Sequence, residues 1–191
     1  MPRIDEEVKN FLEHLEVVGN KAPKTLENYR HYLGRFREFL AENIEPKNID
    51  LKKVNNYRLY LNRLDRKQKL GIKTQNYHVI ALRAFLKYLI KNDIRTLAPE
   101  KIELGKIPER TVEVMSREEL DRLFKAVDQT KKYGPRDTAI LETLYSTGLR
   151  VTELISLNRE QTDLKRREFM VRGKGKKPRI VFLSKRAVEA I

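Results

Sequence analysis

The sequence predicts a mainly α-helical protein with a small antiparallel β-sheet, built from a four-helix domain followed by an α+β domain. Three observations favour this fold class. Apolar residues recur at helical spacing through the first half of the chain. Two short apolar runs near residue 175 flank a turn rich in Gly and Lys, as in a β-hairpin. Proline and glycine interrupt both patterns over residues 93–114, where we expect a linker.

Four helices are expected within residues 1–92. The first is indicated by the apolar spacing from Ile4 to Leu15, which Gly19 follows. Thr25, Asp50 and Thr74 are residue types that cap helix N-termini, and a run with helical spacing follows each of them. Four helices with short connections are typical of a compact helical domain.

The α+β domain is expected over residues 115–191. It begins at a capping box, in which Ser116 precedes Glu119 by three residues. A helix then starts near Gly134 and ends at Gly148. The pattern next predicts a short helix, a strand, a turn, a second strand and a helix capped by Ser184, over residues 151–157, 168–172, 173–178, 179–183 and 184–191.

The positive charge of the chain indicates a polyanionic partner. The formal net charge is +14 at pH 7 in 191 residues, which exceeds what solubility requires. From Lys52 to Lys91 there are eleven Lys and Arg residues against one acid, and from Asp163 to Arg186 ten against two. Two separate basic tracts favour two contact surfaces, because an ordinary solvated helix face intersperses both signs. A basic surface without a nucleic-acid partner is the alternative.

Several classes of protein are excluded or disfavoured by composition. The chain has no cysteine, which excludes disulfides, thiolate metal sites and thiol nucleophiles. The N-terminal residues lack the apolar core of a signal peptide, and no apolar run approaches membrane-spanning length. We therefore expect a cytoplasmic protein that associates with the nucleoid and makes no membrane contact.

The first segment whose side chains could take part in a reaction surrounds Arg150. This arginine comes just after Gly148, at the start of a predicted helix. Helix N-termini favour anions, and the planar guanidinium suits phosphate oxygens. Glu153, one turn further on, could hold the guanidinium in place. An ordinary salt bridge at a helix corner is an equally good interpretation of this spacing.

The second such segment is the predicted turn that carries Lys174. This lysine lies between Gly173 and Gly175, so its side chain could reach a phosphate or donate a proton without steric hindrance. The segment is not a P-loop, because it joins two strands and lacks that sequence pattern. A basic turn that only contacts the DNA backbone is the alternative.

Together these segments resemble the tyrosine recombinase (phage integrase) family, and most closely its Xer-type members. The resemblance is carried by Thr-Gly-Leu-Arg at 147–150, Glu153, and Gly-Lys-Gly-x-Lys-x-Arg at 173–179. It implies a SAM-like core-binding domain over residues 1–92, a linker over 93–114, and the N-terminal part of a catalytic domain over 115–191. Such proteins clamp duplex DNA and cleave it through a phosphotyrosyl intermediate, without a metal or other cofactor.

The resemblance also implies roles for individual residues. Arg150 would bind the scissile phosphate, Glu153 would support it, and Lys174 would protonate the departing 5′ oxygen. Further contacts to DNA are expected from Lys24, Thr25, Lys73, Thr74, Gln75, Arg83, Lys87, Lys176, Lys177 and Arg179.

One departure from the family limits the expected activity. The family has a His-x-x-Arg pair and a nucleophilic tyrosine downstream of the lysine turn, whereas all eight tyrosines here lie at or before Tyr145. We expect a shortened chain that binds duplex DNA but is inactive alone, with homo-oligomers forming on paired sites only in a longer protein. The alternatives are a non-catalytic accessory factor or competitor, and an RNA-binding protein, which its lack of an aromatic sheet motif disfavours.

Overall fold

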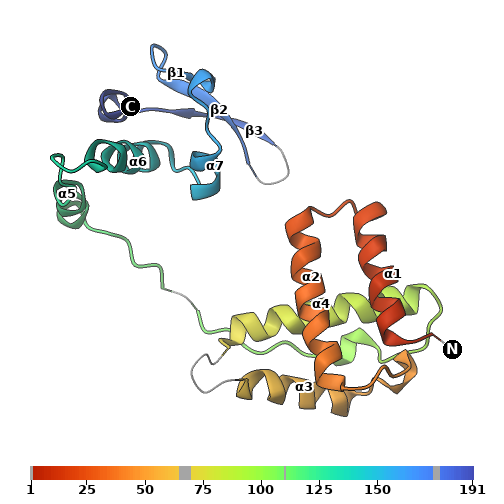
Figure 1. Ribbon diagram of the computed structural model, residues 1–191. Coiled ribbons are helices and arrows are strands. Elements are labelled where there is room, and N and C mark those ends of the chain that lie inside the picture. Colours follow the sequence, from red (N-terminus) through yellow and green to blue (C-terminus); the bar gives the residue numbers. More distant parts are fainter. Residues whose placement is uncertain (1, 65–69, 110, 174–176) are drawn as a thin grey trace. The chain divides into compact units, whose positions relative to one another are not determined.

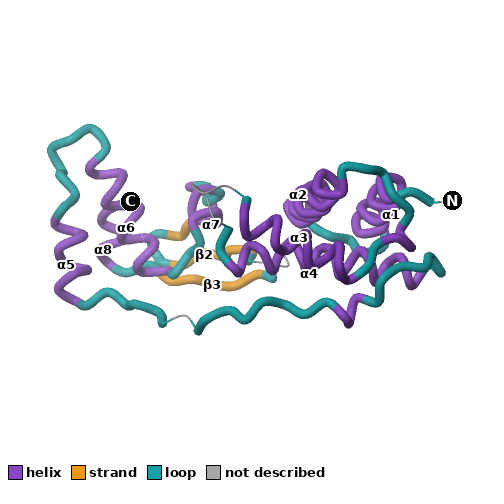
Figure 2. The backbone as a smooth tube through the Cα atoms, turned by 90° about the horizontal axis from the view of Figure 1, so that it is seen from below, coloured by secondary structure: helices purple, strands orange, loops and turns teal. Residues whose placement is uncertain are grey.

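The computed structural model describes residues 2–64, 70–109, 111–173 and 177–191 (Figure 1). The chain forms two compact units, Met1–Arg110 and Thr111–Ile191. The first is helical, and within the described residues the strands occur in the second (Figure 2). The predicted fold class, mainly α with a small antiparallel sheet, is confirmed.

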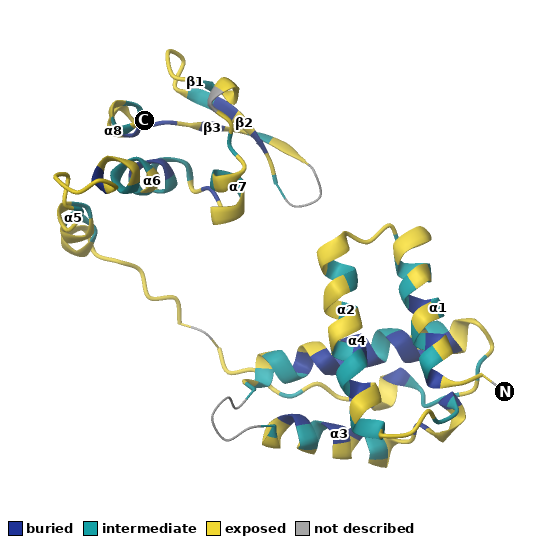
Figure 3. Cartoon of the chain, in the orientation of Figure 1, coloured by how far each residue is buried: buried dark blue, intermediate teal, exposed yellow. Residues whose placement is uncertain are grey.

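Within its described residues, the first unit is built from four α-helices around one apolar core. These are α1 (Ile4–Val17), α2 (Pro23–Leu40), α3 (Leu51–Arg63) and α4 (Ile72–Lys91). Helix α4 contacts the other three helices. One face of α4 is largely buried and packs in the core (Figure 3). The largest fully buried side chains include Tyr57, Phe36 and Phe85. Burial of such aromatic side chains is a main source of stability in a helical domain.

Helix starts in this unit are partly as expected. The side chain of Asp50 caps α3 by accepting a hydrogen bond from the Lys53 backbone N–H at 2.7 Å. The predicted caps Thr25 and Thr74 are wrong, because each lies inside its helix. Helix α2 begins at Pro23, whose fixed φ suits the first helical position and whose missing N–H costs nothing there. Helix α4 begins at Ile72, which packs over the backbone of Gly105.

Part of the stretch expected to be a linker packs on the first unit. Ile102 is buried, and Ile94 and Leu97 pack against the same core. The side chain of Asn76 exchanges two hydrogen bonds with the Gly105 backbone, at 2.8 and 2.9 Å. Residues 94–105 therefore follow the helical unit closely although, apart from the short 3-10 helix Pro99–Lys101, they form no helix or strand.

The second unit places helices against a three-stranded antiparallel sheet. Its strands β1 (Thr162–Asp163), β2 (Glu168–Arg172) and β3 (Pro178–Phe182) lie in the order β1-β2-β3. Strand β1, which is only two residues long, was not expected from the sequence. Phe169 pairs with Val181, and both face the core. The helices are α5 (Arg117–Lys125), α6 (Gly134–Thr147), α7 (Val151–Ile155) and α8 (Lys185–Ala190), with a 3-10 helix at Arg159–Gln161.

Three boundary predictions for this unit are confirmed. Ser116 and Glu119 form the expected capping box at the start of α5. The hydroxyl of Ser184 accepts a hydrogen bond from the Ala187 backbone N–H at 3.0 Å and caps α8. Gly148 has φ of 60° and ends α6 in the left-handed conformation that glycine tolerates best. That reversal directs the chain into α7 and so determines where Arg150 lies.

Candidate active site

Arg150 occupies the N-cap position of α7, two residues after Gly148. The intervening Leu149 is buried in the core of the second unit, and this burial anchors the turn. The Arg150 side chain is 62% exposed. The fold therefore exposes the Arg150 guanidinium to solvent from a backbone position between the buried Leu149 and the first turn of α7.

The carboxylate of Glu153 is the centre of the site. One oxygen, Oε1, accepts hydrogen bonds from Nη1 of Arg150 at 2.9 Å and from Nη1 of Arg179 at 3.0 Å. The other, Oε2, accepts from the Arg150 backbone N–H and from Nη2 of Arg179, both at 2.8 Å. These four bonds satisfy both oxygens, and the Glu153 side chain is only 9% exposed. The hydrogen bond from Arg179 is the main cause that lowers the pKa of Glu153 to about 2.

The turn between β2 and β3 begins beside this cluster. The Gly173 backbone N–H donates to the Lys177 carbonyl at 3.0 Å and closes the base of the turn. A Cβ on Gly173 would lie 2.9 Å from Nη1 of Arg179 and 3.9 Å from Nη1 of Arg150. The chain thus enters the turn next to both arginines. Lys174 and Lys176 lie outside the described residues, and Lys177 is exposed.

The side chains expected to contact DNA from the first unit lie on α2 and α4. Lys73 and Lys87 are exposed, and their spacing places them on one face of α4 together with Tyr77 and Ile80. Arg83 and Thr74 are half-buried on the same helix. On α2, Thr25 is half-buried, and Lys24 is exposed and pairs with Glu27 at 2.7 Å.

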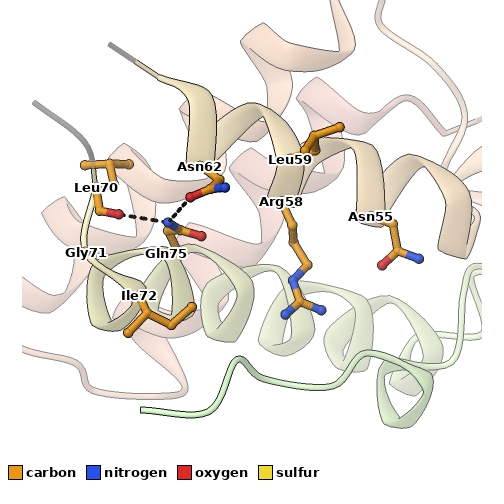
Figure 4. A pocket seen from close by; sticks show the side chains of 8 residues that line it. All are labelled: Asn55, Arg58, Leu59, Asn62, Leu70, Gly71, Ile72 and Gln75. Carbon is orange, nitrogen blue, oxygen red and sulfur yellow. Dashed lines mark hydrogen bonds between the residues drawn. The ribbon is translucent and has the colours of Figure 1, made fainter. Parts of the chain in front are cut away.

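Gln75 makes contacts within the protein that the sequence did not indicate. Its amide nitrogen donates to the Leu70 carbonyl at 2.8 Å and to Oδ1 of Asn62 at 3.3 Å (Figure 4). These bonds tie the end of α3 to the start of α4. Gln75 also lines a cavity of about 690 Å³, together with Asn55, Arg58, Leu59, Asn62, Leu70, Gly71 and Ile72.

The first unit also contains a buried series of hydrogen bonds that the sequence did not indicate. Nη1 of Arg35 lies 3.3 Å from Nε2 of His78, whose Nδ1 lies 3.1 Å from the hydroxyl of Tyr57. That hydroxyl donates to the Tyr32 carbonyl at 3.4 Å. The signal that could have found it is the position of His78 among the apolar residues of α4, where a buried imidazole needs partners.

The described residues hold no group of three or more His, Cys, Asp or Glu side chains placed to bind a metal ion. Within the same part of the chain, none of the helices combines the length and the apolar character needed to cross a bilayer. The candidate site is the cluster in which Arg150 and Arg179 share the Glu153 carboxylate.

Family models match both units. Residues 113–191 match the model described as Phage integrase family, and residues 8–93 match the model described as Phage integrase, N-terminal SAM-like domain. Among curated proteins, tyrosine recombinase XerD of Vibrio vulnificus is 33% identical over 186 residues, covering 96% of this chain and 60% of the relative. Tyrosine recombinase XerC of Bacillus subtilis is 31% identical over 193 residues, covering 100% and 62%. The chain thus spans about 60% of the length of these relatives.

Solved structures share the fold. The Tn1549 transposon integrase in complex with transposon right end DNA has a TM-score of 0.75 at 17% identity, covering 96% of this chain and 63% of that one. The XerH recombinase bound to palindromic difH substrate has a TM-score of 0.66 at 20% identity, with coverage of 96% and 55%. At these identities the likeness concerns the fold alone.

Proposed function

Since the chain belongs to the phage integrase family of tyrosine recombinases and is Xer-like, we propose that it binds duplex DNA and forms part of a site-specific recombinase. In that enzyme Arg150, Glu153 and Lys174 would belong to the active site. The observation that carries the proposal is the exposed guanidinium of Arg150, held by Glu153 beside the base of the β2–β3 turn. A fixed, solvent-facing arginine is suited to a phosphodiester, whose oxygens it can bind as a fork.

The chemistry follows from where charge develops during cleavage. The oxygen of a tyrosine attacks phosphorus, a phosphotyrosyl bond forms, and the bond from phosphorus to the 5′ oxygen breaks. Arg150 would stabilise the added negative charge on the non-bridging oxygens. Lys174 would give a proton to the 5′ oxygen as it departs. Glu153 would keep Arg150 oriented without touching the substrate.

The nucleophile is proposed to come from outside these 191 residues. The two tyrosines of the second unit have other surroundings. Tyr145 packs edge-on against Phe124 with ring centroids 5.8 Å apart. The guanidinium of Arg136 lies over the Tyr133 ring, with its Cζ 4.4 Å from the ring centroid. Neither contact involves Arg150 or Glu153.

Binding of duplex DNA is supported by the charge of the chain and its distribution. The formal net charge is +14, and both units contribute a basic tract. Lys73 and Lys87 of the first unit are exposed on one face of α4, as phosphate contacts require. Association with the nucleoid would follow from such affinity, and homo-oligomers would form when a longer recombinase pairs two sites.

A suicide duplex that carries a nick near the cleavage point tests the proposal. We expect the 191-residue chain to shift the duplex on a native gel without leaving a covalent band on a denaturing gel. The longest reading frame that contains the chain should leave a covalent band, which Arg150→Ala should abolish. Absence of any shift would refute DNA binding. Binding without cleavage by the longer protein would favour the non-catalytic accessory factor.

A further inference from the structure

We infer that Arg179 is a positioning residue that fixes Glu153, and through it Arg150, to the β2–β3 hairpin. The inference deepens the proposed function, because it depends on that function for the phosphate that Arg150 would bind. From the sequence, Arg179 was expected to contact DNA directly. The structure points to a different role, in which this arginine organises the site from behind.

The first support is the way the two arginines share one carboxylate. Arg179 reaches Glu153 with both terminal nitrogens, at 3.0 Å to Oε1 and 2.8 Å to Oε2. The Arg150 side chain reaches it with Nη1 alone, at 2.9 Å. A fork-to-fork pair fixes the plane of both groups, whereas a single bond leaves the rest of the guanidinium available. Arg179 is therefore the anchor and Arg150 the free donor.

Exposure separates the two arginines in the same way. The Arg150 side chain is 62% exposed, and the Arg179 side chain 37% exposed. Glu153, which lies between them, is nearly covered. A phosphate that approaches from solvent would meet Arg150 with most of its N–H donors unused. At Arg179, by contrast, both terminal nitrogens already donate hydrogen bonds to Glu153.

The second support is the position of Arg179 in the hairpin. It lies on β3, where it pairs with Val171 of β2, and Val171 is buried in the core of the unit. The ion pair to Glu153 therefore joins the sheet to α7 across 26 residues of sequence. Gly173 packs directly over Nη1 of Arg179. One side chain thus links the exposed arginine to Gly173, the residue that precedes Lys174 in sequence.

The charge count shows why a second arginine is useful there. A single Arg150–Glu153 pair would be neutral, and the carboxylate would weaken the attraction of Arg150 for a phosphate. With Arg179 the three groups sum to one positive charge, because Glu153 remains ionised. Arg179 supplies both the anchor and the compensating charge.

The experiment compares Arg179→Gln and Arg179→Lys with a matched control, Arg172→Gln. Arg172 is exposed on β2 of the same hairpin, whereas the groups that lower the pKa of Glu153 are Arg179 and Arg150. The Gln variants remove the same charge, whereas Arg179→Lys keeps the charge but cannot span both oxygens of Glu153. Spectra of each chain in labelled form establish that the fold is retained.

The first measurement follows the Glu153 carboxyl carbon by NMR as the pH is lowered, with no DNA present. We expect Arg179→Gln to raise the pKa of Glu153 toward its ordinary range, and Arg172→Gln to leave the Glu153 titration unchanged. A mere loss of stability would not move this titration selectively. An unchanged titration in Arg179→Gln overturns the inference, and this result is independent of whether the protein cleaves DNA.

The second measurement is the cleavage rate constant at saturating DNA, in the longest reading frame that contains the chain. Both Arg179 variants should slow cleavage by roughly tenfold to a hundredfold, the effect of a slightly misplaced catalytic group. Their affinity for DNA should fall no further than that of Arg172→Gln. Normal cleavage at saturating DNA, with weaker binding, would show that Arg179 is a phosphate contact. Absence of cleavage by the parent protein would count against the proposed function, and the titration would then decide the inference.

Discussion

The Tyr57 hydroxyl and the His78 imidazole, both buried in the first unit, lie 3.1 Å apart and form the middle of a directional hydrogen-bond chain. Because Arg35 can only donate, Nε2 of His78 must accept and Nδ1 must carry the proton. Tyr57 then accepts from His78 and donates to the Tyr32 carbonyl. This series of hydrogen bonds is complete only while the His78 imidazole is neutral. Burial and the Arg35 charge favour this form and lower the pKa of His78 to about 4.

The first prediction is that His78 makes the helical unit sensitive to acid. Its ordinary pKa is 6.5, so the unfolded chain takes up a proton below that pH while the folded chain does so only near pH 4. Stability from this group is complete above pH 6.5 and is lost as the pH falls toward 4. The loss amounts to at most about 3 kcal/mol.

Urea unfolding between pH 7 and 4 measures this effect. We expect His78→Gln to lower stability at pH 7 but to flatten its dependence on pH. His14→Gln, which removes a histidine outside this hydrogen-bond chain, is the matched control for the loss of an imidazole. Equal slopes for the parent and His78→Gln would show that His78 is not held neutral.

The second prediction concerns the salt dependence of DNA binding. Each neutralised phosphate contributes about −0.9 to the slope of log K against log salt. Basic tracts on two units should neutralise several phosphates, so the slope should be at least as steep as about −4. Fluorescence anisotropy at increasing concentrations of potassium chloride measures it. A nearly flat dependence would contradict a contact made through phosphates by both units.

Much of the fold could be predicted because its signals are local. Asp50, Ser116 and Ser184 cap helices where the sequence placed them, and Gly148 ends α6 as expected. Thr25 and Thr74 failed as caps because each helix begins before them, α2 at Pro23 and α4 at Ile72. Proline at the first helical position is a local signal, whereas the contact of Ile72 with Gly105 is long-range and has no local signature. The two-residue strand β1 carries too little pattern to be recognised.

Only part of the candidate site could be predicted from the sequence. Arg150 is the N-cap of α7 and Glu153 lies three residues further on, in its first turn, so their pairing could be expected from spacing alone. The bond between Glu153 and Arg179 joins segments 26 residues apart, and it depends on the register of β2 against β3. The predicted hairpin gave only an approximate register, in which Arg172 and not Val171 would pair with Arg179, so Arg179 resembled any other basic residue of the hairpin.

The third prediction uses Gly173 to disturb this arrangement without changing charge. A Cβ there would lie 2.9 Å from Nη1 of Arg179, so Gly173→Ala should displace the Arg179 guanidinium from Glu153. The flexible end of Arg179 can move, and the fold should therefore survive. We expect slower cleavage with nearly unchanged DNA affinity, together with a raised pKa of Glu153 by NMR. Gly34→Ala is the control, since a Cβ at Gly34 meets nothing within 4 Å.

Gly34→Ala should instead stabilise the helical unit by about 0.5–1 kcal/mol, because alanine loses less conformational entropy than glycine within a helix. It should leave cleavage and the Glu153 titration as they are. If both glycine variants slow cleavage equally, the effect of Gly173→Ala does not come from Arg179.

The fourth prediction concerns Lys174, which lies outside the described residues but follows Gly173 directly in sequence. If Lys174 is the general acid of the longer recombinase, Lys174→Ala should slow cleavage by roughly 10²-fold to 10⁴-fold. DNA binding should change much less, because Lys177 and other basic residues of the second unit remain. Single-turnover cleavage and a binding isotherm measure the two effects separately.

A substrate with sulfur at the bridging 5′ position gives the prediction its sharpest form. A departing alkoxide is a strong base and needs a proton in the transition state, whereas a thiolate leaves without one. The sulfur substrate should therefore restore cleavage to Lys174→Ala. It should not restore Arg150→Ala, because the role proposed for Arg150 is to stabilise charge on the non-bridging oxygens, which the substitution leaves in place. Rescue of both variants, or of neither, would show that Lys174 is not the general acid and would leave it as a residue that only binds the DNA backbone.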